Sequence, residues 1–222
     1  MKNILKPFST VLFQGDSITD CGRNRELIYN PQSSNPQSKD DLGQGYPAKI
    51  ALLWDIYFPN SGIRFFNRGI SGNRVTDLLE RYEKDFLAIN PDLISILIGI
   101  NDTWRRYDKN DPTDVEVFES NYRKLLSKIK LDMPNAFIVI MEPFLLSSMP
   151  ERDQWREDLD PKIQAVRRLA KKYADVFIPM DGIFAYYTVQ GTKESLMAAD
   201  GVHPTPLGHG IIGSEWLRAL GF

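Results

Sequence analysis

The residues Val11-Leu12-Phe13-Gln14-Gly15-Asp16-Ser17 carry the strongest structural signal in this chain, because they place an apolar strand directly before a polar turn. The first three residues are apolar on both faces, which is typical of a strand in a parallel sheet that helices cover on both sides. Gly15 is expected to let the backbone turn tightly where the chain leaves the strand. The hydroxyl of Ser17 would then be exposed at the carboxyl edge of the sheet.

Further short apolar runs follow along the chain, and longer segments of helical period separate them. The expected strands after the first are Ile63–Phe66, Leu93–Ile98, Ala136–Met141 and Val176–Pro179. The expected helical segments are 47–58, 75–86, 118–129, 163–173 and about 207–220. Strands and helices that alternate at this spacing predict a three-layer α/β/α sandwich with right-handed crossovers.

The composition restricts the class of protein. A chain of 222 residues without a visible linker or repeat suits one domain, so we expect residues 1–222 to form a single domain. A net charge of −2 argues against a nucleic-acid partner, because proteins that bind nucleic acid usually present a stripe of basic side chains. No apolar run approaches the ~20 residues of a membrane span, and Met1–Pro7 does not resemble a signal peptide. One cysteine excludes an internal disulfide, and a cytoplasmic protein is expected.

Two long polar or mixed stretches interrupt the alternation of strands and helices. Residues 24–45 are rich in Asn, Gln, Ser, Pro and Asp, and residues 142–158 mix prolines with aromatic side chains that include Trp155. Both are expected as loops over the carboxyl ends of the strands, where open α/β sheets carry their sites.

Ser17 and a segment near the other end of the chain contain the parts of a nucleophilic ester hydrolase. Asp200-Gly201-Val202-His203-Pro204 places one of the chain's two histidines three residues after an acid. A serine hydroxyl, a histidine base and an acid that orients the base are brought together by the fold, whatever their separation in sequence. No G-x-S-x-G occurs, which argues against an α/β-hydrolase nucleophile elbow.

Two segments that follow strands could stabilise an oxyanion. Residues 67–73 follow the second strand and open a helix, so their backbone N–H groups would point outward at its positive end. Gly99-Ile100-Asn101-Asp102 follows the third strand, and the amide of Asn101 would lie at the same edge. Alternatively, these glycines serve turns and the Asn and Asp residues cap helices.

Taken in order, these segments resemble the four signature blocks of the SGNH (GDSL-type) hydrolases. The blocks are Gly15-Asp16-Ser17, Gly72, Gly99-Ile100-Asn101-Asp102 and Asp200-Gly201-Val202-His203. The resemblance implies a flavodoxin-like parallel sheet, with Ser17 as nucleophile, His203 as base and Asp200 as the orienting acid. It also implies an oxyanion hole formed by the backbone N–H groups of Ser17 and Gly72 and the side chain of Asn101. Ile18 stands where the family's name has leucine, a position that varies within the family.

The longer matches 14–23, 69–72 and 99–107 are similar to the intracellular acetylxylan esterase branch of that family. This resemblance implies an esterase that removes acetyl groups from xylan fragments and forms a homo-oligomer. Trp104 and Tyr107, expected on a loop after Asn101, could bind the flat face of a sugar ring. Alternatively, both rings only pack against that loop.

Other functions and roles remain open at this point. A lysophospholipase or thioesterase for longer acyl chains, or a non-catalytic carbohydrate-binding relative, would share the same blocks. Cys21 is expected as a small buried residue, and His209 is expected to face solvent or a backbone group. Asp16 and Asp102 are expected to hold loops through backbone hydrogen bonds. Two histidines and one cysteine are too few for a usual zinc site, so neither a metal nor a cofactor is expected.

Overall fold

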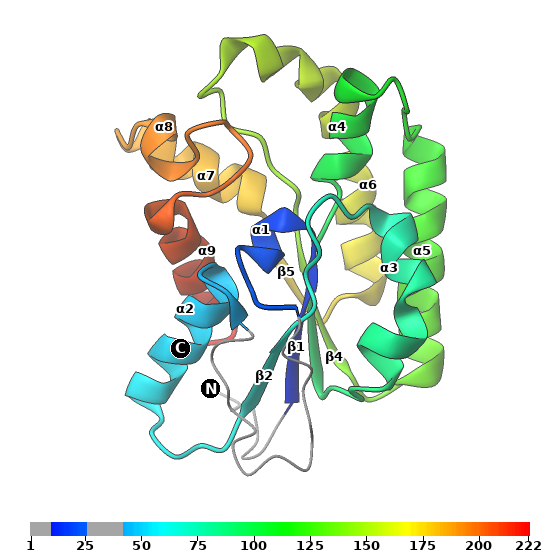
Figure 1. Cartoon of the computed structure of the whole chain (residues 1–222), viewed down its shortest axis with the longest axis vertical. Coiled ribbons are helices and arrows are strands. Elements are labelled where there is room, and N and C mark those ends of the chain that lie inside the picture. The colour runs from blue at the N-terminus through cyan, green and yellow to red at the C-terminus, as the bar shows by residue number, and fades with distance from the viewer. Residues whose placement is uncertain (1–9, 26–41) are drawn as a thin grey trace.

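The computed structural model describes residues 10–25 and 42–222, and within them five parallel strands form one sheet (Figure 1). The strand order is β2-β1-β3-β4-β5. The strands are β1 (Thr10–Gly15), β2 (Arg64–Asn67), β3 (Leu93–Leu97), β4 (Phe137–Met141) and β5 (Val176–Ile178). The expected fold, a parallel sheet between two layers of helices, is confirmed.

Helices cover the sheet on both faces, α2, α7, α8 and α9 on one side and α3, α5 and α6 on the other (Figure 1). The α-helices are α1 (Ser17–Asp20), α2 (Tyr46–Tyr57), α3 (Val75–Glu80), α4 (Ile100–Asp108), α5 (Val115–Asp132), α6 (Arg156–Tyr173), α7 (Met180–Val189), α8 (Glu194–Met197) and α9 (Pro206–Ala219). A π-helical turn spans Glu83–Leu87 and a 3₁₀ helix spans Pro150–Trp155. No helix of the described part of the chain is long and apolar enough to cross a membrane.

The strands are apolar on both faces because both faces are buried. In β1, Val11 and Phe13 belong to the core under α2 and α9, whereas Leu12 belongs to the core under α3 and α5. Ile94 and Ile96 of β3 join Leu12 in the second core. Successive side chains of a strand point to opposite faces, so a strand between two helical layers reads as a continuous apolar run.

The sheet register brings three chain exits to one edge. Gly15 lies opposite Leu97 in the β1–β3 pair, and Phe13 lies opposite Asn67 in the β1–β2 pair. The chain therefore leaves β1, β2 and β3 at the same carboxyl edge. In an open sheet with this strand order, the crevice between β1 and β3 is where the connections diverge to opposite faces and ligands bind.

Several elements differ from those that the sequence predicted. Trp104 and Tyr107 lie on helix α4 and not on a loop. The stretch 142–158 is only partly a loop, since it contains the 3₁₀ helix and the start of α6. The helical segment expected over 75–86 ends at Glu80 and is followed by a π-helical turn. Helices α7 and α8 were not predicted, and most of the stretch 24–45, together with Met1–Pro7, lies outside the described residues.

Candidate active site

Ser17 is the first residue of α1, the single helical turn that follows β1. Asp16 caps this turn, since its Oδ1 accepts a hydrogen bond from the amide of Ile18 at 2.9 Å. Gly15 is needed for space and does not adopt a positive φ: a Cβ there would lie 2.2 Å from Oγ1 of Thr19 and 2.4 Å from the carbonyl oxygen of Leu97. The close approach of β1, α1 and β3 therefore fixes the backbone that carries the Ser17 hydroxyl.

Ser17, His203 and Asp200 form one chain of hydrogen bonds. Oγ of Ser17 lies 2.9 Å from Nε2 of His203, and Nδ1 of His203 lies 2.8 Å from Oδ2 of Asp200. With a neutral imidazole, Nδ1–H donates to the carboxylate and Nε2 accepts the serine hydroxyl. In this arrangement a histidine can act as a base for a serine hydroxyl. The three side chains that the sequence proposed as a triad are thus brought together.

The carboxylate of Asp200 is held by its own turn. Oδ1 accepts the backbone amides of Val202 at 3.0 Å and His203 at 2.7 Å, which leaves Oδ2 for the imidazole. Partial burial acts to raise the pKa of Asp200, but the hydrogen bonds from the His203 ring and these two amides outweigh it and hold the pKa well below its usual range. Asp200 therefore stays ionised next to the base.

The His203 side chain is 44% exposed, and opposing effects act on its pKa. The hydrogen bond to Asp200 raises the pKa above the usual value of 6.5, while burial acts to lower it. The charges of Asp200 and Asp16 raise the pKa further, and the charge of Arg152 lowers it. The net shift is upward, so the imidazole takes a proton more readily than a free histidine does.

The two segments proposed for the oxyanion hole lie against β1 and each other. The amide of Ile70 donates to the carbonyl of Gly15 at 3.1 Å, which ties residues 69–73 to the end of β1. Asn101, on the first turn of α4, donates from Nδ2 to the carbonyl of Asn73 at 3.1 Å and accepts at Oδ1 from Arg105 at 3.0 Å. The amide nitrogen carries two protons, so one proton remains for a ligand.

Gly72 adopts a φ of +85°, a backbone region that side chains rarely adopt. The space around it is open, since the nearest atom to an added Cβ is a guanidinium nitrogen of Arg105 at 4.0 Å. Glycine is therefore favoured at this position by the backbone conformation of the turn, and not by a lack of space for a side chain.

Two buried carboxyl groups lie beneath the triad, and both hold backbone as predicted. Besides the cap made by Asp16, Oδ2 of Asp102 accepts the amide of Val75 at 3.4 Å. Burial raises the pKa of each carboxyl to about 7. Oδ2 of Asp16 is buried and has no hydrogen-bond partner among residues 10–25 and 42–222. The floor of the site, which we define as Asp16, Asn101 and Asp102 with their backbone, is thus polar and closed to solvent.

Three aromatic rings and one guanidinium group lie next to His203, and we call them the wall: Trp104, Tyr107, Trp155 and Arg152. The ring centroid of Trp104 lies 5.6 Å from that of His203 and 5.2 Å from that of Trp155. Tyr107 stacks on Trp155 at 5.3 Å and donates its hydroxyl to the carbonyl of Gln154. Trp104 therefore borders the His203 ring directly, whereas the ring of Tyr107 contacts that of Trp155. Both rings pack against Trp155, and a contact of either ring with a sugar stays a prediction.

Arg152 was not among the site residues predicted from the sequence, and Trp155 was expected only as an aromatic side chain on a loop that could face the site. Both lie in the 142–158 stretch that was expected over the strand ends, but one arginine among several gave no signal that it would reach Asp200. Trp155 could be recognised only as a large aromatic side chain in that stretch.

Cys21 and His209 form a contact next to the site. His209 is buried, and its Nδ1 accepts the amide of Tyr46 at 3.2 Å, which confirms the expected backbone partner. Its Nε2 lies 3.3 Å from Sγ of Cys21. Burial lowers the pKa of His209 to about 4, so this histidine is neutral and structural. The prediction that Cys21 is buried was wrong: it is only partly buried, at the C-cap of α1 with a φ of +34°.

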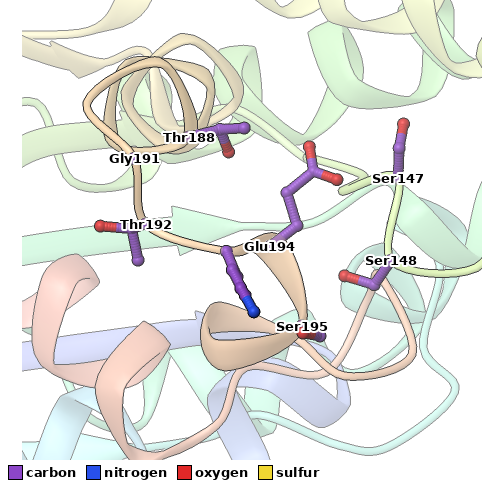
Figure 2. Close-up of a pocket in the computed structure, with 8 residues that line it drawn as sticks. Ser147, Ser148, Thr188, Gly191, Thr192, Glu194 and Ser195 are labelled. Carbon is purple, nitrogen blue, oxygen red and sulfur yellow. The ribbon is translucent and has the colours of Figure 1, made fainter.

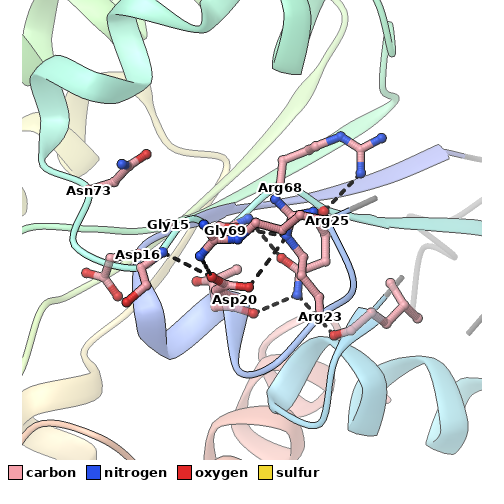
Figure 3. A network of polar contacts seen from close by, with 12 residues as sticks. Gly15, Asp16, Asp20, Arg23, Arg25, Arg68, Gly69 and Asn73 are labelled. Atoms are coloured by element: carbon pink, nitrogen blue, oxygen red, sulfur yellow. Dashed lines mark hydrogen bonds and ion pairs between the residues drawn. The ribbon is translucent and has the colours of Figure 1, made fainter. Parts of the chain in front are cut away.

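A network of charged side chains holds the turn after α1 (Figure 3). Asp20 accepts hydrogen bonds from Arg25 and from the amide of Ser71, the latter at 3.1 Å. Arg23 donates to the carbonyl of Gly69 at 2.8 Å. These contacts join α1 to residues 69–71, so the nucleophile turn and the proposed oxyanion segment form one unit.

A separate hollow opens on the surface beside α8, with a volume of about 450 Å³ (Figure 2). Its lining is rich in hydroxyl groups, and none of the three triad residues contributes to it. The residues that line it are Ser147, Ser148, Thr188, Gly191, Thr192, Lys193, Glu194 and Ser195. Across residues 10–25 and 42–222, no cluster of three or more His, Cys, Asp or Glu side chains is arranged to hold a metal ion.

Comparison with known proteins agrees with this geometry. The sequence matches the model of the GDSL-like lipase/acylhydrolase family over residues 13–211. An acetylxylan esterase from Geobacillus stearothermophilus is 36% identical over 214 residues, which are 96% of this chain and 94% of that protein.

Solved structures are similar over nearly the whole chain. A protein from Parabacteroides merdae described as a GDSL-like lipase has a TM-score of 0.88 at 35% identity, and the match covers 98% of this chain and 97% of that one. A catalytic mutant of the Geobacillus stearothermophilus acetylxylan esterase, with a serine replaced by alanine, has a TM-score of 0.84 at 34% identity and covers 98% and 96% of the two chains. The resemblance inferred from the sequence is confirmed.

Proposed function

The chain belongs to the GDSL-like lipase/acylhydrolase family and is a carboxylic ester hydrolase, and we propose that it removes acetyl groups from carbohydrates such as acetylated xylooligosaccharides. The observation that carries the proposal is the continuous hydrogen-bonded chain from Ser17 through His203 to Asp200, next to an aromatic wall. The name of the similar acetylxylan esterase supports the substrate class.

In the proposed first half-reaction, Oγ of Ser17 attacks the acetyl carbonyl carbon while Nε2 of His203 takes the hydroxyl proton. The carbonyl electron pair moves onto its oxygen, where the N–H groups of Ser17 and Gly72 and the side chain of Asn101 donate to it. The imidazolium stays paired with Asp200. When the tetrahedral intermediate collapses, the bond to the sugar oxygen breaks, and His203 returns the proton to that oxygen.

In the proposed second half-reaction, water replaces the sugar. His203 takes a proton from the water as its oxygen attacks the acetyl-Ser17 carbonyl, and the same donors stabilise the second oxyanion. Collapse breaks the bond to Oγ of Ser17, which receives the proton back from His203, and acetate leaves. No cofactor takes part, because both steps exchange only protons and one acyl group.

The wall supports a sugar substrate on physical grounds. Trp104 is half-buried and lies next to His203, so an alcohol leaving from the triad would pass close to its ring. Aromatic rings bind the apolar faces of sugars, and one such contact adds on the order of 1 kcal/mol beyond the area it buries.

The test is acetate release from acetylated xylooligosaccharides, run beside a series of 4-nitrophenyl esters from acetate to octanoate. We expect release that depends on Ser17 and a steep decline in kcat/KM as the acyl chain lengthens. An enzyme that prefers octanoate would contradict the acetyl proposal and favour a lysophospholipase or thioesterase. The single domain over residues 1–222, a homo-oligomer and a cytoplasmic location stay predictions.

A further inference from the structure

Arg152 contacts the triad acid at two points. Its Nη1 lies 2.6 Å from the carbonyl oxygen of Asp200 and 3.3 Å from Oδ2, the same carboxylate oxygen that accepts the Nδ1–H of His203. The arginine side chain is only 18% exposed, so water screens this contact less than it screens a surface ion pair. One guanidinium thus holds both the backbone and the side chain of Asp200.

The same guanidinium lies between two rings of the wall. Its central carbon is 4.7 Å from the ring centroid of Trp104 and 5.0 Å from that of Trp155. A planar guanidinium can stack on aromatic faces while its edge N–H groups donate to oxygen, which a lysine ammonium cannot do in the same geometry. Trp104 in turn lies 5.6 Å from the ring of His203, so Arg152 contacts both neighbours of the base.

We propose that Arg152 is a positioning residue that locks the Asp200 turn to the Trp104–Trp155 wall and keeps His203 poised as a base. The proposal rests on the triad assigned under the proposed function. Arg152 lies on the 3₁₀ helix (150–155), far in sequence from Asp200, so it couples the 142–158 stretch to catalysis. A displacement of this stretch would then change both the substrate wall and the orientation of the triad.

The charged groups around His203 set the expected direction of the pH effect. Asp200 on its own turn and Asp16 at the end of β1 favour the imidazolium, while Arg152 on the 3₁₀ helix opposes it. His209 on α9 also interacts with His203, but it is neutral because burial lowers its pKa to about 4. Trp104 on α4 is uncharged. Removal of the Arg152 charge should therefore raise the pKa of His203.

The experiment compares Arg152→Met with Arg152→Lys and with Arg156→Met. Methionine keeps an apolar side chain of similar length between the rings but removes the charge and the donors. Arg156 is a matched control, because it lies close in the chain and is half-buried but bonds to Asp160 and Asp181, not to Asp200. Two readouts are taken: kcat and KM for 4-nitrophenyl acetate against pH, and the titration of the His203 ring by NMR.

For Arg152→Met we expect kcat to fall roughly tenfold with little change in KM, the order expected when a charge-assisted hydrogen bond to the triad acid is lost. The acid limb of kcat/KM and the NMR titration of His203 should both move to higher pH. Arg152→Lys should return the pH profile most of the way to that of the wild type, because it keeps the positive charge. It should not restore kcat, because it loses the planar stack on the two rings. Arg156→Met should leave the NMR titration of His203 unchanged.

An unchanged His203 titration in Arg152→Met would overturn the proposal, as would an equal shift in Arg156→Met. If Arg152→Met does not fold, Arg152→Lys decides: full wild-type kcat would contradict a positioning role that needs the planar guanidinium. The NMR readout does not depend on turnover. The chain has two histidines, so the signal that remains in His209→Gln is that of His203. A failure of the esterase proposal therefore stays distinguishable from a failure of this one.

Discussion

The floor and the wall of the site are built in different ways, although both border the same serine. The floor consists of buried groups at the ends of β1 and β3, and backbone hydrogen bonds hold Asp16 and Asp102. The wall consists of the buried Trp155 and three partly buried side chains on α4 and the 3₁₀ helix, and its rings are held by stacking and by contact with Arg152. We infer that the floor supplies fixed electrostatics for the chemistry and that the wall supplies substrate contacts and orients the base.

The largest expected effect separates the two histidines. His203→Ala should lower kcat/KM by ~10⁴-fold, since it removes the triad base. His209→Ala should leave the kcat of folded enzyme near wild type and lower the free energy of unfolding by roughly 1–3 kcal/mol, because it leaves the buried Tyr46 amide without its acceptor. Steady-state kinetics with chemical denaturation measures both. A reversal of the two outcomes would place the base on α9.

A floor substitution should act on the transition state. Asn101→Ala should lower kcat by roughly 10²–10³-fold with a smaller change in KM, because one oxyanion donor acts mainly on the charge that develops during reaction. The hydrolysis of 4-nitrophenyl acetate measures this. A change confined to KM would instead make Asn101 a substrate-binding or structural residue.

Floor and wall should move the pH profile in opposite directions. The base must be neutral, and Asp200 holds the pKa of His203 above 6.5, so kcat/KM should be lost as the pH falls through that raised value. Asp16→Asn keeps an acceptor for the Ile18 amide but removes a carboxyl group with a pKa of about 7, whose ionised form favours the imidazolium. Its acid limb should shift to lower pH, opposite to Arg152→Met. Shifts of the same sign would refute the assignment of charges around His203.

The smallest expected effect belongs to the wall and depends on the substrate. Trp104→Ala should impair acetylated xylooligosaccharides more than 4-nitrophenyl acetate, by about 1–2 kcal/mol in kcat/KM, since the aryl ester carries no sugar to stack. Tyr107→Ala serves as the comparison and should show a smaller gap, because the ring of Tyr107 contacts that of Trp155, whereas Trp104 borders the His203 ring. Equal losses on both substrates would mean that Trp104 only supports the wall.

The floor residues and the rings of Trp104 and Tyr107 could be proposed from the sequence, whereas Arg152 could not. Val11–Phe13 reads as a buried strand, and the residue types Ser, Asn, Asp and His after strands or in turns limit the chemistry available there. Arg152 gave no comparable signal, because its role arises from packing between residues that are about 50 positions apart in the chain.

Helix α4 was missed for a different reason. Ile100, Trp104 and Tyr107 recur at helical spacing, but the segment was interpreted as a loop at the rim of the site because it follows the proposed oxyanion segment. The periodicity was present, and it would have placed both aromatic rings on one face of a helix.

The most direct test of Ser17 as the nucleophile is covalent labelling with a fluorophosphonate, followed by peptide mass spectrometry. We predict one label per chain on the peptide that carries Ser17, no label in Ser17→Ala, and full labelling in Ser147→Ala, a control on the surface hollow. Turnover in Ser17→Ala should fall by ~10⁴-fold or more while the fold is kept. A label on another residue, or a Ser17→Ala enzyme that keeps half of its activity, would contradict the assignment of the nucleophile.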